Sequence, residues 1–110
     1  MTKDFLDNRE RHLAIQALID GSGYPKSDEA QRQIGYSSTE LHKLTDELLQ
    51  NHNKKLTDTE KQVILNCLAG ALHYVTTDIP SLYDISEAEL KEFKENLEKR
   101  WGMHSTYSKD

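Results

Sequence analysis

The chain has 110 residues, of which 35% are hydrophobic and 30% are charged, and its formal net charge is −5. This length fits one domain that buries a core without needing disulfides or metals. The acidic balance disfavours nonspecific binding to nucleic acid, because contacts to phosphate need clustered Lys and Arg side chains.

No apolar run is long enough to span a bilayer, and residues 1–7 are too highly charged for a signal peptide. The single cysteine, Cys67, excludes an internal disulfide and fits a reducing compartment. We therefore expect a cytoplasmic protein that does not bind membranes.

The first predicted helix covers residues 4–20, where apolar side chains recur with helical spacing on one face. The glycines within residues 20–23 end this helix, because glycine readily adopts the left-handed conformation found at helix C-termini. Pro25 prevents the helix from resuming. Ser27 fits the N-cap of a short extra helix near residues 27–33.

A capping box predicts the start of the next helix, over residues 38–51. In this box the Ser37 hydroxyl accepts a hydrogen bond from the backbone N–H of Glu40, and the Glu40 carboxylate accepts one from the backbone N–H of Ser37. The leucines that follow form a narrow apolar stripe, and the polar residues 51–55 form a linker.

A second capping box, Thr57 with Glu60, opens onto the broadest apolar face of the chain. It predicts a helix over residues 58–75, which we expect to be the central helix of the core. The small residues 69–71 lie within this helix and allow another helix to approach closely. A homodimer contact through them is an alternative to packing inside the chain.

The last helix is predicted between Pro80 and Gly102. Pro80 disfavours a helical conformation for the residue before it, and so predicts a loop or a short turn. Ser86 and Glu89 form a third capping box, which predicts a helix over residues 86–101. Gly102 provides the C-terminal stop.

These elements predict an all-α fold, a small bundle of four main helices plus the short extra helix. The single helical domain covers residues 1–102, and the polar residues 103–110 are predicted to form a flexible tail. The predicted core consists of Leu6, Leu13, Ala17, Leu18, Leu41, Leu44, Leu48, Ile64, Cys67, Leu68, Ala71, Leu72, Leu90, Phe93 and Leu97.

The two halves of the chain also resemble each other. Residues 6–18 align with residues 56–68 at a constant offset of 50, as in 60 − 10, and share the positions of their apolar and charged side chains. Ser37 and Glu40 align with Ser86 and Glu89 at an offset of 49, as in 86 − 37. A duplicated helical hairpin would explain this order, although any two amphipathic helices align tolerably.

No pattern predicts catalysis or the binding of a metal or cofactor. The five histidines are scattered, and none has the helical spacing of a zinc motif. Cys67 lies on the apolar face without a nearby partner that could activate it. Residues 20–31 fail as a calcium loop because Pro25 and Gln31 replace the required glycine and glutamate. We expect no enzyme activity, no cofactor and no metal.

Residues 28–49 match the outline of a helix-turn-helix, with a short helix, a turn that contains Gly35, and an amphipathic helix. The second helix carries three acidic residues against one lysine, which disfavours contact with phosphate. A DNA-binding regulator that uses residues 28–49 is therefore the alternative function.

Four aromatic residues, Tyr24, Tyr36, Tyr83 and Trp101, lie at predicted loops or helix ends. Aromatic rings at such places often anchor interfaces, so we predict that these four residues bind a partner, while their alternative role is to seal the ends of the bundle. An acidic domain without catalytic residues suits a basic protein partner. We expect a protein-interaction module, such as an inhibitor, immunity or regulatory protein of bacterial or phage type.

Overall fold

The computed structural model describes residues 6–22, 38–51, 54–74 and 78–105, and it describes no side chain for residues 21, 22, 38, 73 and 74. The described residues contain no strand and form five helices, which are α1 (Asn8–Ser22), α3 (Ser38–Gln50), α4 (Asp58–Tyr74), α5 (Ile79–Tyr83) and α6 (Glu87–Trp101). The predicted all-α bundle is confirmed. The predicted short helix near residues 27–33 lies outside the described residues.

Helix α1 begins later than the predicted residue 4, because Asp7 caps it. The backbone N–H of Glu10 donates to Oδ1 of Asp7 over 2.8 Å, and the backbone N–H of Asp7 donates to Oε1 of Glu10 over 3.1 Å. These reciprocal bonds satisfy two donors that a helix start otherwise leaves without partners. The apolar periodicity that suggested an earlier start carries no information about this cap.

The capping boxes predicted for the two later helices are confirmed. At α4, the Thr57 hydroxyl accepts from Glu60 over 3.1 Å and the Glu60 carboxylate accepts from Thr57 over 2.9 Å. At α6, Ser86 and Glu89 exchange the same two bonds. The predicted box of Ser37 with Glu40 cannot be compared, since Ser37 lies outside the described part of the chain.

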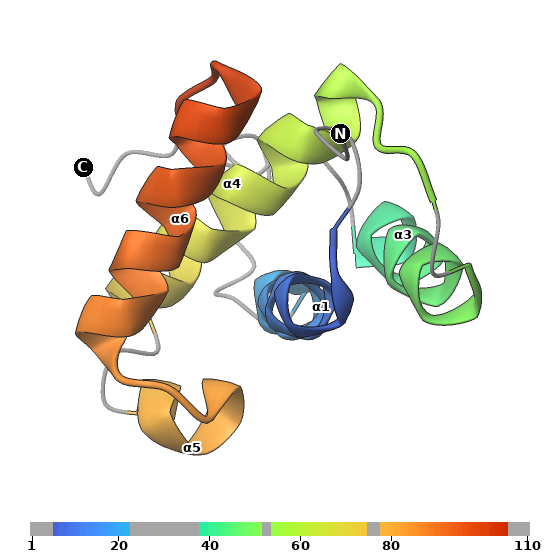
Figure 1. The fold of residues 1–110 in the computed structure, drawn as a ribbon. Helices are drawn as coiled ribbons and strands as arrows, with labels where there is room; N and C mark the ends of the chain where they lie inside the picture. The colour runs from blue at the N-terminus through green and yellow to red at the C-terminus, as the bar shows by residue number, and fades with distance from the viewer. Residues whose placement is uncertain (1–5, 23–37, 52–53, 75–77, 106–110) are drawn as a thin grey trace.

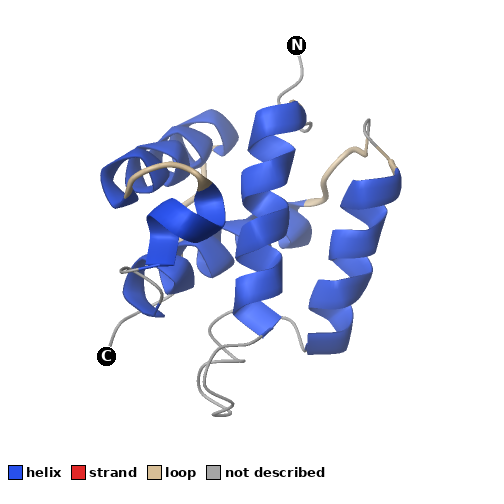
Figure 2. Cartoon of the chain, turned by 90° about the horizontal axis from the view of Figure 1, so that it is seen from below, coloured by secondary structure: helices blue, strands red, loops and turns tan. Residues whose placement is uncertain are grey.

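Helix α1 occupies the middle of the molecule and packs against both α3 and α4. In Figure 1 it is seen nearly end-on, with α3 on one side and α4 and α6 on the other; Figure 2 shows the same arrangement from below. Helix α4 packs in turn against α6, and the short α5 contacts α1 and α6. The bundle therefore consists of two helical pairs, α1 with α3 and α4 with α6, joined through α1 and α4.

The observed caps agree with the alignment of the two halves. Asp7 and Glu10 align with Thr57 and Glu60, and both pairs form capping boxes. Leu6 and Leu56 precede these boxes, and both are buried. The pairing of α1 with α3 and of α4 with α6 is the arrangement expected for duplicated hairpins, while an evolutionary duplication itself stays a prediction.

Every predicted core residue except Leu72 and Phe93 belongs to the observed core, and those two are partly buried and pack against it. Truncation of a fully buried leucine such as Leu68 to alanine is expected to cost about 2–5 kcal/mol. The small residues Gly70 and Ala71 are buried within the chain, and a homodimer stays a prediction. The core also includes residues that the sequence did not predict there, namely Ala14, Leu56, Val63, Leu65, Ile79, Tyr83 and Trp101.

Pro80 predicted a loop or a short turn, whereas residues Ile79–Tyr83 form the short helix α5, of which Ile79 is the first residue. Proline is tolerated in the first turn of a helix because its missing N–H would have no intrahelical acceptor there. Ile79 is fully buried, and this burial outweighs the bias that Pro80 places on its backbone. The helix ends at Asp84, whose φ of 60° lies in the left-handed region.

The predicted C-terminal tail begins with residues that contact the fold. The backbone N–H of Ser105 donates to Glu98 over 2.8 Å, and its hydroxyl donates to Oδ1 of the buried Asn66 over 3.2 Å. Gln62 donates to the carbonyl oxygen of His104 over 2.8 Å. The described part of this segment therefore lies against α4 and α6. The flexibility of the tail stays a prediction.

Candidate functional site

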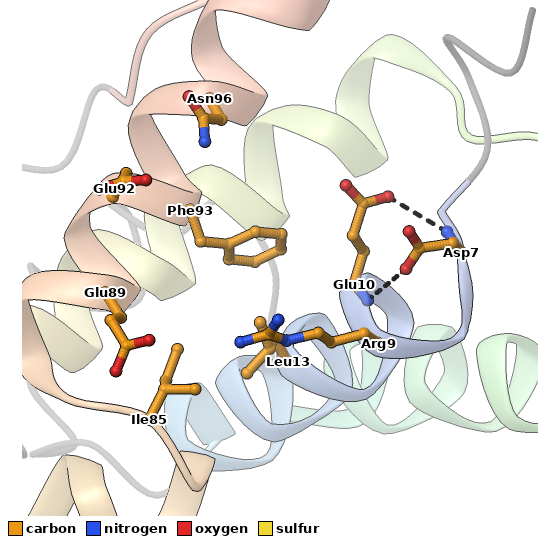
Figure 3. Close-up of a pocket in the computed structure, with 9 residues that line it drawn as sticks. All are labelled: Asp7, Arg9, Glu10, Leu13, Ile85, Glu89, Glu92, Phe93 and Asn96. Carbon is orange, nitrogen blue, oxygen red and sulfur yellow. Dashed lines mark hydrogen bonds between the residues drawn. The ribbon is translucent and has the colours of Figure 1, made fainter.

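A groove of about 350 Å³ lies between the start of α1 and α6, both of which pack against α4. Figure 3 shows the side chains around it, which come from the first turns of α1, the segment before α6, and one side of α6. The lining residues are Asp7, Arg9, Glu10, Leu13, Ile85, Glu89, Glu92, Phe93 and Asn96.

The floor of the groove is apolar. Leu13 is 4% exposed, and Ile85 and Phe93 are partly buried residues that pack against the core. The Phe93 ring projects from α6 toward α1 and leaves one part of its surface facing the groove (Figure 3). These three side chains form a small apolar surface that a ligand could cover.

The rim of the groove is acidic. Among the described residues, four carboxylates line it, from Asp7, Glu10, Glu89 and Glu92, against the single guanidinium of Arg9. Two of these carboxylates, those of Asp7 and Glu10, cap α1, and Glu89 caps α6. The two capping boxes therefore fix three of the four acidic side chains at the edge of the groove.

Hydrogen bonds and charges keep the Glu89 carboxylate ionised. The backbone N–H of Ser86 and the Ser86 side chain both lower the pKa of Glu89, and the charge of Arg9 acts in the same direction. Figure 3 shows Arg9 extending above Leu13 on the side of the groove where Glu89 and Ile85 lie. Arg9 thus compensates part of the negative charge at that end.

The carboxylates of Glu10 and Glu92 differ in how much of their charge is compensated. Glu10 forms a two-point ion pair with Arg100 of α6, with distances of 2.9 and 3.2 Å. Glu92 is exposed and, within the described part of the chain, makes no hydrogen bond or ion pair. The charge of Glu92 is therefore available to a ligand without the loss of an existing contact.

Neither a reactive cysteine nor a metal-binding cluster is found among the described residues. Burial, together with the charge of Asp20, raises the pKa of the Cys67 thiol, which keeps it protonated and unreactive. No group of three or more His, Cys, Asp or Glu side chains among the described residues could hold a metal ion. The expectation that the protein is not an enzyme stays a prediction.

Two of the predicted partner-binding residues fill the core of their own chain. Tyr83 is 1% exposed, and its hydroxyl donates to Oδ2 of Asp20 over 2.7 Å. Trp101 is 6% exposed, and the cationic groups of Lys61 and Arg100 lie 5.9 and 6.0 Å from the centre of its ring. Both positions agree with the alternative role of sealing the bundle.

The assignment of Tyr83 and Trp101 to partner binding stays a prediction, as does that of Tyr24 and Tyr36, which lie outside the described residues. The groove was not predicted from the sequence, although Phe93 was placed in the core. The sequence signal was the close spacing of Glu89, Glu92 and Phe93 on one helix. That signal could not be interpreted without knowing that α1 lies opposite.

The described part of the helix-turn-helix alternative is α3. Its leucines at 41, 44 and 48 are buried in the core, while Glu40, Lys43 and Asp46 are exposed. The exposed surface of α3 is therefore not basic, in agreement with the charge count from the sequence. The turn and the first helix of the predicted motif lie outside the described residues.

No protein-family model, curated protein or solved structure gives a significant match to this chain. None of the helices in the described ranges has the length and apolar character needed to cross a membrane. The groove between α1 and α6 is therefore interpreted from its own shape and charge.

Proposed function

We propose that the protein is an acidic protein-interaction module that binds a basic partner and covers part of that partner's surface. It would act in the cytoplasm as an inhibitor, immunity or regulatory protein of bacterial or phage type. The observation that supports this proposal is the groove between α1 and α6, with its apolar floor and acidic rim.

Protein interfaces commonly combine a small apolar centre with a polar rim that excludes water. The α1–α6 groove has both parts, with Leu13, Ile85 and Phe93 at the centre and four carboxylates around them. The net charge of −5 adds a long-range attraction for a basic partner. Such attraction mainly increases the association rate and selects against acidic partners.

The DNA-binding alternative has no comparable support. A protein that neutralises phosphates needs clustered cations, whereas the exposed side chains of α3 include Glu40 and Asp46 beside Lys43. Retardation of a DNA duplex at low salt, lost steeply as salt rises, would revive that alternative.

A pull-down experiment with matched charge variants tests the proposal. Tagged full-length wild type, Glu92→Lys and Glu95→Lys would be incubated with lysate of the source organism at moderate salt, followed by quantitative mass spectrometry. Glu92 lines the groove, whereas Glu95 is exposed on the same helix and does not line it. Both variants change the total charge equally.

The expected result is one stoichiometric basic protein that wild type and Glu95→Lys recover and Glu92→Lys does not. Recovery of nucleic acid or of no protein would refute the proposal. Recovery of the same basic protein by all three baits would show that the partner does not bind at the groove. Circular dichroism of the three baits would confirm that each is folded.

A further inference from the structure

We infer that the α1–α6 groove binds a partner segment in which one aliphatic side chain is flanked on both sides by Lys or Arg. This inference rests on the proposed function and specifies the chemistry of the partner. It follows from the size of the groove, the nature of its floor, and the contacts its carboxylates already make.

The floor selects an aliphatic side chain. A groove of about 350 Å³ is at the small end of ligand sites, and Phe93 is among the residues that line it. Leu13 and Ile85 supply the remaining apolar contacts, so the occupant gains most by covering all three residues. A purely polar segment would leave this surface without a partner.

The carboxylates select cations on either side of that side chain. Glu92, on α6, makes no ion pair with described residues, and Asp7, on α1, accepts the capping hydrogen bond through Oδ1 alone. In Figure 3 these two carboxylates lie on opposite sides of the Phe93 ring. A cation on each side of the aliphatic residue can therefore reach one of them.

The remaining acidic side chains are less available. Glu10 is held by Arg100, and Glu89 accepts hydrogen bonds from Ser86 while it lies near Arg9. Arg9 is the single cation among the described residues that line the groove, and it competes with a cationic ligand. Its removal should strengthen binding, a gain that damage to the fold would not produce.

Three capped tripeptides of one length serve as probes. They are N-acetyl-Arg-Leu-Arg amide, the same peptide with Gly in place of Leu, and the same peptide with Glu in place of both Arg residues. Each would be titrated into the ¹⁵N-labelled full-length protein, and the dissociation constant would be measured from the amide shifts of the residues that line the groove.

The Arg-Leu-Arg peptide should shift the amides of Leu13, Glu92 and Phe93. It should bind about tenfold more tightly than the Gly peptide, because an open groove covers only part of a leucine side chain. Glu92→Gln should weaken it and Arg9→Gln should strengthen it, each by about two- to fivefold, the range of exposed ion pairs. The control Glu95→Gln should have no comparable effect.

Equal binding of the Leu and Gly peptides, tighter binding of the Glu peptide, or shifts that avoid the groove would overturn the inference. So would a lower affinity in Arg9→Gln. The pull-down and the peptide titration can give opposite results, so they test the proposed function and this inference independently. Recovery of a partner that depends on Glu92, without selective peptide binding, would leave the proposed function standing with a partner of other chemistry. Selective peptide binding without such recovery would support the groove chemistry and refute the proposed function.

Discussion

Cys67 shows how burial decides the chemistry of a single residue. The thiol lies fully buried in α4, and both its removal from water and the charge of Asp20 raise its pKa. Because the thiolate is the reactive form, a cysteine in this environment behaves as a small apolar side chain.

We predict that Cys67 in the native protein reacts with a thiol reagent such as dithionitrobenzoate at least about a hundredfold more slowly than in the unfolded chain, because labelling requires opening of the core. The measurement is the release of the chromophore at pH 8 in buffer and in denaturing urea. A rapid and complete reaction in buffer would show that the region around Cys67 is open.

Tyr83 carries a second prediction at this scale. Its buried hydroxyl donates to Asp20, which also accepts from Gln16 over 3.0 Å. Replacement by Phe keeps the ring and removes this bond, so Tyr83→Phe should lower the free energy of unfolding by about 1–3 kcal/mol, measured by urea titration.

If Tyr83 acts in partner binding instead, the same variant would weaken recovery of the partner at unchanged stability. The comparison therefore distinguishes the two roles considered for this residue.

At the scale of elements, the caps decide where the helices begin and end. The Ser86–Glu89 box at the start of α6 includes a charge, because the Glu89 carboxylate accepts from the backbone N–H of Ser86. That bond is the main cause of the lowered pKa of Glu89. A carboxyl whose pKa is lower in the folded state contributes stability above its unfolded pKa and loses it as pH falls through the folded pKa.

Glu89→Gln tests this contribution, since Gln can form the same box without the charge. The wild type should melt at a higher temperature than the variant at pH 7. The difference should begin to shrink near the ordinary pKa of glutamate, about 4.3, and vanish only at a pH below the lowered pKa of the folded protein. Thermal unfolding followed by circular dichroism from pH 7 to pH 2.5 is the measurement. The control Glu89→Ala should be less stable at every pH, and a difference that does not depend on pH would contradict the role of the charge.

The end of α6 depends on Gly102, whose φ of 66° lies in the left-handed region. The backbone N–H groups of Gly102 and Met103 both donate to the carbonyl oxygen of Glu98. A Cβ at position 102 would meet no atom within 4 Å, so the cost of a substitution comes from the backbone alone.

Gly102→Ala should therefore lower the free energy of unfolding by about 1 kcal/mol, the cost of placing a non-glycine residue in this conformation. Gly102→Asn should cost less, because asparagine adopts the left-handed conformation more readily. Urea titration of both variants gives the comparison. An alanine variant as stable as the wild type would mean that the chain ends α6 in another way.

At the scale of the whole molecule, the sequence alone was sufficient to predict the structural features that depend on neighbouring residues. The boxes at Thr57 and Ser86, the faces of the main helices and the Gly102 stop each depend on side chains a few positions apart. The Asp7 cap was missed because apolar periodicity continued before it. The helix at Pro80 was missed because the burial of Ile79, which outweighs the local bias, depends on tertiary packing.

The groove depends entirely on such packing. Asp7 and Arg9 come from α1, whereas Glu92 and Phe93 come from α6 at the other end of the sequence. No spacing rule relates residues this far apart. For the same reason the sequence left open whether Tyr83 and Trp101 bind a partner or seal the bundle. A sequence can therefore suggest an acidic interaction module while leaving the position of its candidate surface unknown.

The ion pair of Arg100 with Glu10 joins the first and last helices beside this surface. Its partners are 90 residues apart, and their side chains are 33% and 22% exposed. Two-point guanidinium–carboxylate contacts are stronger than single ones, but partial exposure to water reduces their net contribution. The Nε atom of Arg100 is buried and has no hydrogen-bond partner among the described residues, so the position of the guanidinium depends on its bonds to Glu10.

A double-mutant cycle with Arg100→Gln, Glu10→Gln and the double variant isolates this pair, because Gln at position 10 can keep the cap of α1. We expect a coupling energy of about 1 kcal/mol from urea titrations in low salt, and a smaller value in about 0.5 M NaCl, where exposed charges are screened over a few ångströms. A coupling near zero in low salt would show that the two helices are held together by packing on α4 and α5. In that case the width of the groove would not depend on Arg100, and Arg100→Gln would leave the binding of the Arg-Leu-Arg peptide unchanged.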